Sequence, residues 1–101
     1  MTLSDHIRDI GMKIGFAINT HRMPGDNGKA LDEIEGLVDV LRGASGYTDR
    51  DCEQLVAEAR IYYGPSPLPA GPKSAEDRYL SLRQLAVSIQ GTSHVLRRKG
   101  L

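Results

Sequence analysis

The residues of this 101-residue chain that could support chemistry are three histidines and one cysteine. A zinc site needs histidine or cysteine ligands at short local spacing, such as two histidines one helical turn apart. His6, His21 and His94 show no such spacing, and no cysteine lies near any of them. Asp5 and Asp9 could orient His6, but an exposed histidine at a helix start explains the same pattern. We therefore expect no metal ion and no cofactor.

Cys52 is the candidate nucleophile, and its activation would need a base brought from another helix. It lies on a stripe of apolar residues, where a cysteine usually acts as a small buried hydrophobic residue. A single cysteine cannot form an internal disulfide, which suits a reducing compartment. No catalytic constellation emerges from these spacings, so we expect a protein that is not an enzyme.

The zero net charge hides an uneven distribution of charged residues. Residues 27–63 carry eight acidic and four basic side chains, whereas residues 73–101 carry two acidic and six basic ones. A polyphosphate ligand would favour the second segment, and Arg97, Arg98 and Lys99 are its candidate anion contacts. Two simpler explanations remain open. Basic residues stabilise the C-terminal end of a helix, and the two segments could pack together and offset each other.

Residues 29–63 could also form a helix-turn-helix unit, because two expected helices flank a short link that contains glycine. The second helix would then read DNA, and it begins with the acidic stretch TDRDCEQ at residues 48–54. Phosphate contacts dominate the affinity for DNA, so this acidic edge opposes binding. We expect no DNA recognition through this unit. The alternative function is a small nucleic-acid-associated regulator that uses the basic C-terminal helix.

Four helices must position all of these residues. Apolar residues recur at intervals of three and four, and each such segment ends at glycine or proline. The pattern predicts an all-α, four-helix single domain without strands. The expected helices cover residues 4–21, 28–43, 48–63 and 74–98. Their expected N-caps are Ser4, Asp26 or Asn27, Thr48 and Ser74.

A proline-rich connector precedes the last helix. Residues 64–72 read GPSPLPAGP, with four prolines in nine residues. Proline cannot continue a helix, and an extended polyproline connector of this length could reach roughly 25–28 Å. Residues 73–101 could therefore cross the first three helices, or detach and join another subunit. No apolar run is long enough to span a bilayer and no secretory signal is apparent, so we expect a cytoplasmic protein.

The first and last helices carry the features that suggest contacts between proteins. Gly11 and Gly15 lie four residues apart, and each costs about 1 kcal/mol of helix propensity relative to alanine. We expect a second backbone to pack into this notch, from the same chain or from a copy. Aromatic side chains dominate the energetics of many interfaces. The expected partner contacts are Phe16, Tyr62, Tyr63 and Tyr79.

The segment LSDHIRDIGMKIG, followed by PGD and ALDEIEGLVDVL, resembles a helical segment that recurs in phage tail and tail-fibre proteins. The resemblance covers residues 3–41. It implies a structural, self-associating protein, with no catalytic residues to carry over, and a virion as an alternative location. We therefore expect a non-enzymatic helical assembly or adaptor protein that acts by protein–protein contacts. Its partner would be another protein or itself, as a homo-oligomer, and not a membrane.

Overall fold

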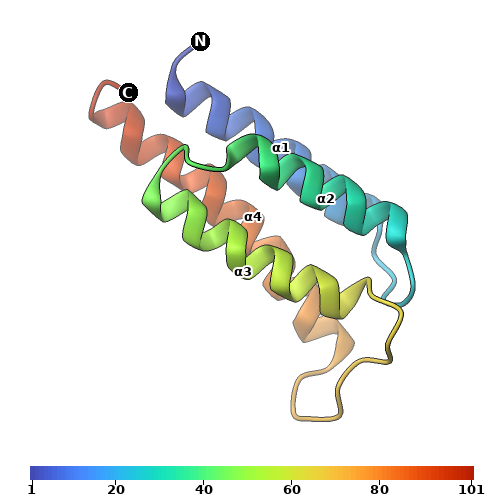
Figure 1. The fold of residues 1–101 in the computed structure, drawn as a ribbon. Coiled ribbons are helices and arrows are strands. Elements are labelled where there is room, and N and C mark those ends of the chain that lie inside the picture. The colour runs from blue at the N-terminus through green and yellow to red at the C-terminus, as the bar shows by residue number, and fades with distance from the viewer.

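The computed structural model describes all 101 residues as four helices, each antiparallel to the one before it (Figure 1). The helices are α1 Leu3–Thr20, α2 Gly28–Leu41, α3 Gly46–Tyr62 and α4 Ala75–Arg98. The prediction of an all-α, four-helix domain is confirmed, and each predicted end lies within two residues of the observed one.

Side-chain caps determine where the helices begin. The four N-caps are Thr2, Asn27, Ser45 and Ser74. The predicted caps Ser4 and Thr48 are wrong, because the Thr2 and Ser45 hydroxyls reach the first free amides instead. Ser4 and Thr48 are buried, and each hydrogen-bonds the hydroxyl of the capping residue before it. Each of these predicted caps is therefore a helical residue that supports the true cap.

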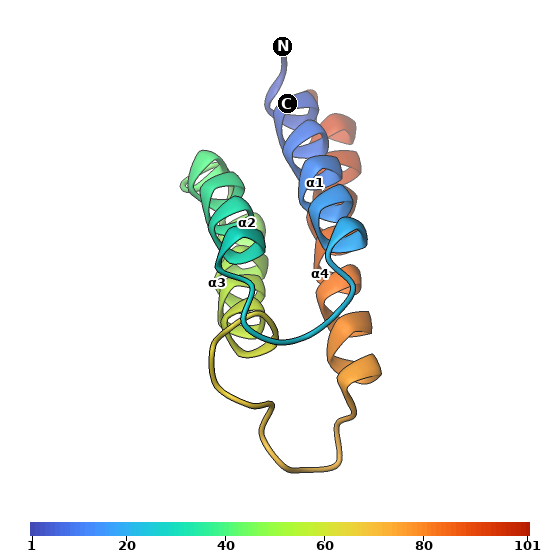
Figure 2. The same ribbon diagram turned by 90° about the vertical axis from the view of Figure 1, so that its right-hand side faces the viewer.

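The helices form a closed square in cross-section. α1 packs against α2 and α4, and α3 packs against the same two helices, whereas the diagonal pairs bring no Cα atoms within 8 Å of each other. Figure 2 shows α1 and α4 side by side, opposite the pair α2 and α3. The outer face between α1 and α2 therefore lies on the opposite side of the molecule from the outer face between α3 and α4.

The core lies along the axis of this square, and every helix contributes to it. Its large, fully buried aliphatic side chains are Ile7, Ile14, Ile18, Ile34, Leu41, Leu55, Leu82 and Ile89. The spacing predicts an apolar stripe on the first helix, and its four inner residues are buried: Ile7, Ile10, Ile14 and Ala17. The two outer residues of the stripe, Leu3 and His21, are partly buried. Helical spacing also places Met12 and Phe16 on one flank of this stripe and predicts that they widen it, but both are exposed, and Ile18 is buried instead. The apolar face of α1 therefore turns towards α4 more than its spacing predicts.

The glycine notch of α1 is filled by α4 of the same chain. A Cβ atom at Gly11 would lie 2.8 Å from Gln90 Cγ and 3.3 Å from Ile89 Cγ2. Gln90 Nε2 also donates a hydrogen bond of 3.3 Å to the Gly11 carbonyl. At Gly15 the nearest atom, Gln90 Nε2, would lie 3.5 Å away, which is ordinary contact. The notch therefore joins α1 to α4, and it provides no argument for a second copy.

The connector joins α3 to α4 at the end of the bundle away from the termini (Figure 2). Residues 64–72 make no backbone hydrogen bonds, although Leu68 packs partly against the core. α4, the basic last helix, could offset the acidic charge of residues 27–63 by packing against both α2 and α3. It packs against α3 and α1 but not against α2, because the square arrangement places α2 diagonally opposite.

Candidate binding surfaces

Tyr62 and Tyr63 are internal residues of the bundle. Their side chains are 2% and 0% exposed, and the two rings pack edge to face with centroids 5.0 Å apart. Their placement corrects the expectation that these tyrosines contact a partner, because no partner can reach them in this fold. Tyr79 is half-buried against Tyr62, with ring centroids 5.9 Å apart.

The tyrosine hydroxyls hold the loop between α1 and α2 against the end of α3. Tyr63 donates a hydrogen bond of 2.6 Å to the His21 carbonyl, and Tyr62 donates to the Arg22 carbonyl. Backbone bonds run the other way, from the Gly25 amide to the Tyr62 carbonyl (2.9 Å) and from the Asn27 amide to the Tyr63 carbonyl (3.0 Å). Burial raises the pKa of both tyrosines, so both hydroxyls stay protonated and donate at neutral pH.

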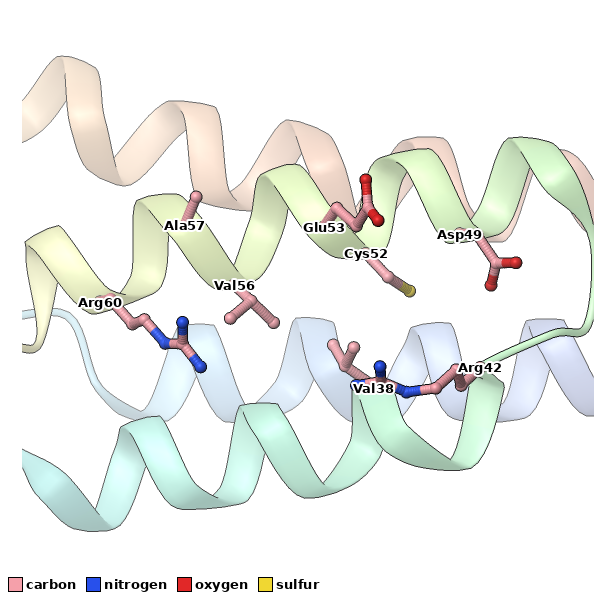
Figure 3. A pocket seen from close by; sticks show the side chains of 8 residues that line it. All are labelled: Val38, Arg42, Asp49, Cys52, Glu53, Val56, Ala57 and Arg60. Carbon is pink, nitrogen blue, oxygen red and sulfur yellow. The ribbon is translucent and has the colours of Figure 1, made fainter.

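A groove of about 350 Å³ lies on the outer face between α2 and α3 (Figure 3). Val38 and Val56 form its apolar part, and Arg42 and Arg60 lie on either side of them. Both arginines are paired with acidic residues of α2. Arg42 lies 2.7 Å from Asp39, and Arg60 lies 2.7 Å from Glu35. The groove therefore offers little uncompensated positive charge to an anion.

Cys52 extends from α3 into this groove (Figure 3). The side chain is buried, and this desolvation, reinforced by the negative charges of Asp49 and Asp51, raises the pKa of the thiol to about 11. The thiol is therefore protonated at neutral pH. A nucleophilic or metal-binding cysteine needs the thiolate, and the surroundings of Cys52 disfavour that form.

A second surface lies on the face between α1 and α2, and we call it the Phe16 patch. It is a groove of about 350 Å³ lined by Asp9, Met12, Lys13, Phe16, Glu33 and Leu37. Phe16 is 72% exposed and Met12 58% exposed, although both are large apolar side chains. Of the four aromatic residues expected at an interface, Phe16 is the one that projects into solvent.

A third surface lies on the opposite face, between the start of α3 and the end of α4, and we call it the Gly91 groove. Its volume is about 700 Å³. Tyr47 and Val87, which are 69% and 65% exposed, line it together with Val95. Gly91 also lines the groove, and nothing lies within 4 Å of where its Cβ would be.

The Gly91 groove was not predicted from the sequence, because its residues come from two segments forty positions apart. Tyr47, Val87 and Val95 all fall outside the apolar stripes of their helices. The sequence feature that could have indicated this groove is the presence of these apolar residues outside the apolar stripes of their helices. A single exposed apolar residue is common on any protein surface, so this signal becomes informative once the fold brings several together.

The basic C-terminal end of α4 is partly neutralised. Arg97 lies 3.2 Å from Asp5 of α1, while Arg98 and Lys99 are exposed at the last turn. The Asp5 carboxylate also accepts hydrogen bonds from Thr2, and these bonds, with Arg97 and Arg8 nearby, lower its pKa. The first of the three predicted anion contacts therefore serves the α1–α4 interface. The other two remain available to solvent.

The histidines are not brought together by the fold. His21 hydrogen-bonds Asn27 and lies 3.6 Å from Glu33, and no group of three or more histidine, cysteine or acidic side chains could hold a metal ion. None of the four helices is both long and apolar enough to cross a membrane. Comparisons with family models, curated proteins and solved structures find no match.

Proposed function

We propose that this chain is a non-enzymatic helical assembly or adaptor protein that acts by protein–protein contacts. The observation that carries the proposal is the Phe16 patch, where a phenylalanine and a methionine stand exposed side by side in a groove between two helices. Phenylalanine and methionine are enriched at protein interfaces relative to the rest of the surface. The charged residues Asp9, Lys13 and Glu33 surround them, as the polar rim of an interface surrounds its apolar centre.

Phe16 and Met12 are exposed together in one groove, which is more informative than a single exposed apolar residue. The ring contributes nothing to the core, which Ile14 and Ile18 fill from the same helix. A polar residue at this position would leave these core contacts unchanged and make the surface less apolar. We infer that a partner covers the ring. Within this proposal the protein works in the cytoplasm, or in a virion if the resemblance of residues 3–41 to phage tail segments reflects common descent.

A photo-crosslinking experiment tests the proposal. The photoreactive residue p-benzoylphenylalanine replaces Phe16 in one variant and Val40, an exposed valine of α2 outside the patch, in a matched control. Both proteins are irradiated in extract from the cells that make them. We expect discrete crosslinked products at position 16, either a multimer of this chain or an adduct with one other protein, and none at position 40. Equal or absent crosslinking at the two positions would refute the proposal.

A further inference from the structure

We propose that the partner of the Phe16 patch is the Gly91 groove of a second copy of this chain, so that copies associate head to tail. The inference rests on the proposed function, since it names the partner of the same patch. It starts from two apolar surfaces that differ in shape. The patch presents the projecting Phe16 ring, whereas the Gly91 groove is a depression of about 700 Å³, large enough to receive an aromatic side chain.

Gly91 supports this assignment. It lies in the middle of α4, where a glycine costs about 1 kcal/mol relative to alanine. The glycine at position 11 is explained by Gln90, which leaves no room for a Cβ. At Gly91 the chain itself leaves the space open. A side chain here would project into the groove and fill it, so the absence of one keeps the groove deep enough for an incoming ring.

The charges around the two surfaces are complementary. Asp9 and Glu33 border the patch. Asp9 lies 3.3 Å from the exposed side chain of Lys13, and Glu33 lies 3.6 Å from His21. Arg50 and Lys99 border the groove and have no ion-pair partner in the chain. The groove's own acid, Asp51, accepts a hydrogen bond of 2.7 Å from Ser88. The patch is thus bordered by more acid than base, and the groove by unpaired base.

The geometry determines the kind of assembly. The patch lies between α1 and α2 and the groove between α3 and α4, on opposite sides of the square. In a dimer, the patch of each copy cannot bind the groove of the other at the same time. Each pairing therefore leaves a free patch on one copy and a free groove on the other. Such head-to-tail pairings extend into a filament or close into a ring. A standard interface of ~800 Å² per copy would take about an eighth of the 6212 Å² surface, which leaves room for two.

Two variants, each lacking one surface, test this arrangement by sedimentation velocity at micromolar concentrations. Phe16→Gln removes the patch, and Gly91→Glu fills the groove and repels Asp9 and Glu33. Both positions are solvent-exposed and helical, so both proteins should fold. Val40→Gln and Gly36→Glu are the matched controls, because they make the same changes at exposed positions of α2 outside both surfaces.

We expect the wild type and both controls to form species larger than a dimer. Each single variant should associate about 30-fold more weakly or worse, the effect of removing a hot-spot residue. An equimolar mixture of the two variants should form a one-to-one dimer and nothing larger, because each keeps the surface that the other lacks. Circular dichroism of each variant checks that the helices are intact.

Three results would overturn the inference. These are a wild type that stays monomeric, a Gly91→Glu variant that still dimerises through its patch, or a mixture that stays monomeric while the wild type assembles. The proposed function is judged separately by crosslinking at position 16. A monomeric wild type that crosslinks to a different protein there would refute self-association and leave the protein–protein function standing.

Discussion

The Tyr63 hydroxyl and the His21 carbonyl lie 2.6 Å apart, although 42 residues separate them in the chain. The bond closes the end of the bundle, because it attaches the loop after α1 to the last turn of α3. The Tyr63 side chain is fully buried, so water cannot easily take the place of its hydroxyl, and a carbonyl that loses its donor at such a site costs about 1–3 kcal/mol. Tyr62 donates a similar hydrogen bond to the Arg22 carbonyl. These two bonds explain why the tyrosines, which the sequence assigned to a partner surface, are instead buried in the bundle.

Tyr63→Phe should therefore lower the free energy of unfolding by about 1–3 kcal/mol, measured by urea denaturation. Tyr79→Phe is the matched control, since its hydroxyl donates a bond of 3.0 Å to the Ile18 carbonyl from a half-buried position. It should cost less, because water can replace the missing donor. An equal loss in the two variants would show that the bond to His21 has no special weight.

Gly11→Ala should lower the free energy of unfolding, because overpacking against Gln90 and Ile89 costs about 1–3 kcal/mol and the gain in helix propensity offsets at most about 1 kcal/mol of it. Gly15→Ala makes the same change one turn later, where the new methyl group meets atoms at 3.5 and 3.9 Å. There the gain in helix propensity should leave the stability unchanged or raised by up to about 1 kcal/mol. Thermal denaturation of the pair measures the difference, and equal effects would contradict a tight α1–α4 contact.

Removal of residues 73–101 should leave a fragment that does not fold cooperatively. α4 covers the inner faces of α1 and α3, and its loss would expose Ile14 and Leu55, which are fully buried in the intact chain. We expect aggregation or binding of the dye ANS, with loss of the near-ultraviolet circular dichroism of the tyrosines. A fragment that stays soluble, folded and cooperative would instead identify α4 as a detachable arm.

Stability should fall at alkaline pH. The pKa of Cys52 rises from its ordinary value of 9.0 to about 11 on folding, so the unfolded chain loses this proton first. The resulting stabilisation is complete below about pH 9 and is lost as the pH rises towards 11. Cys52→Ala should flatten the pH dependence of the urea midpoint in the lower part of that range, below the ionisation of the tyrosines. An unchanged slope would mean that the thiol is accessible to water.

We expect no measurable binding of duplex DNA at physiological salt. One of the three basic residues, Arg97, is already paired with Asp5, and α2 and α3 are acidic. Fluorescence anisotropy over a range of salt concentrations measures the binding. Sub-micromolar affinity that falls steeply with salt would contradict the expectation. The contradiction would be strongest if Arg97→Ala with Arg98→Ala reduced the slope by about 0.9 for each phosphate that is no longer bound.

The helical spacing of the sequence was enough to predict most of the buried aliphatic residues. Ile14, Leu55 and Ile89 recur with the periods of a helix, and that period follows from backbone geometry alone. The widths of the apolar faces were harder to predict. They depend on where the neighbouring helices sit, so Phe16 was assigned to a flank of the core and to a partner at once, and Ile18 was not assigned to the core.

The candidate surfaces depend on contacts between distant segments and were less predictable. Tyr62 and Tyr63 fit both a buried stripe and an interface, and the loop carbonyls that bind them lie forty residues earlier. Gly11 did indicate a close approach, but the identity of Gln90 as the neighbour required the fold. The Gly91 groove exists because α3 and α4 align side by side, and no local pattern records that alignment.

The closure of the square has a mechanical consequence. Because the number of antiparallel helices is even, the N- and C-terminal ends of the chain lie at the same end of the bundle (Figure 1), and Asp5 and Arg97 form an ion pair there. A force that pulls the two chain termini apart would separate α1 from α4 one helical turn at a time. At each moment the contacts of a single turn would bear the force. A force applied between the N-terminus and the connector would instead shear the whole helix pair at once.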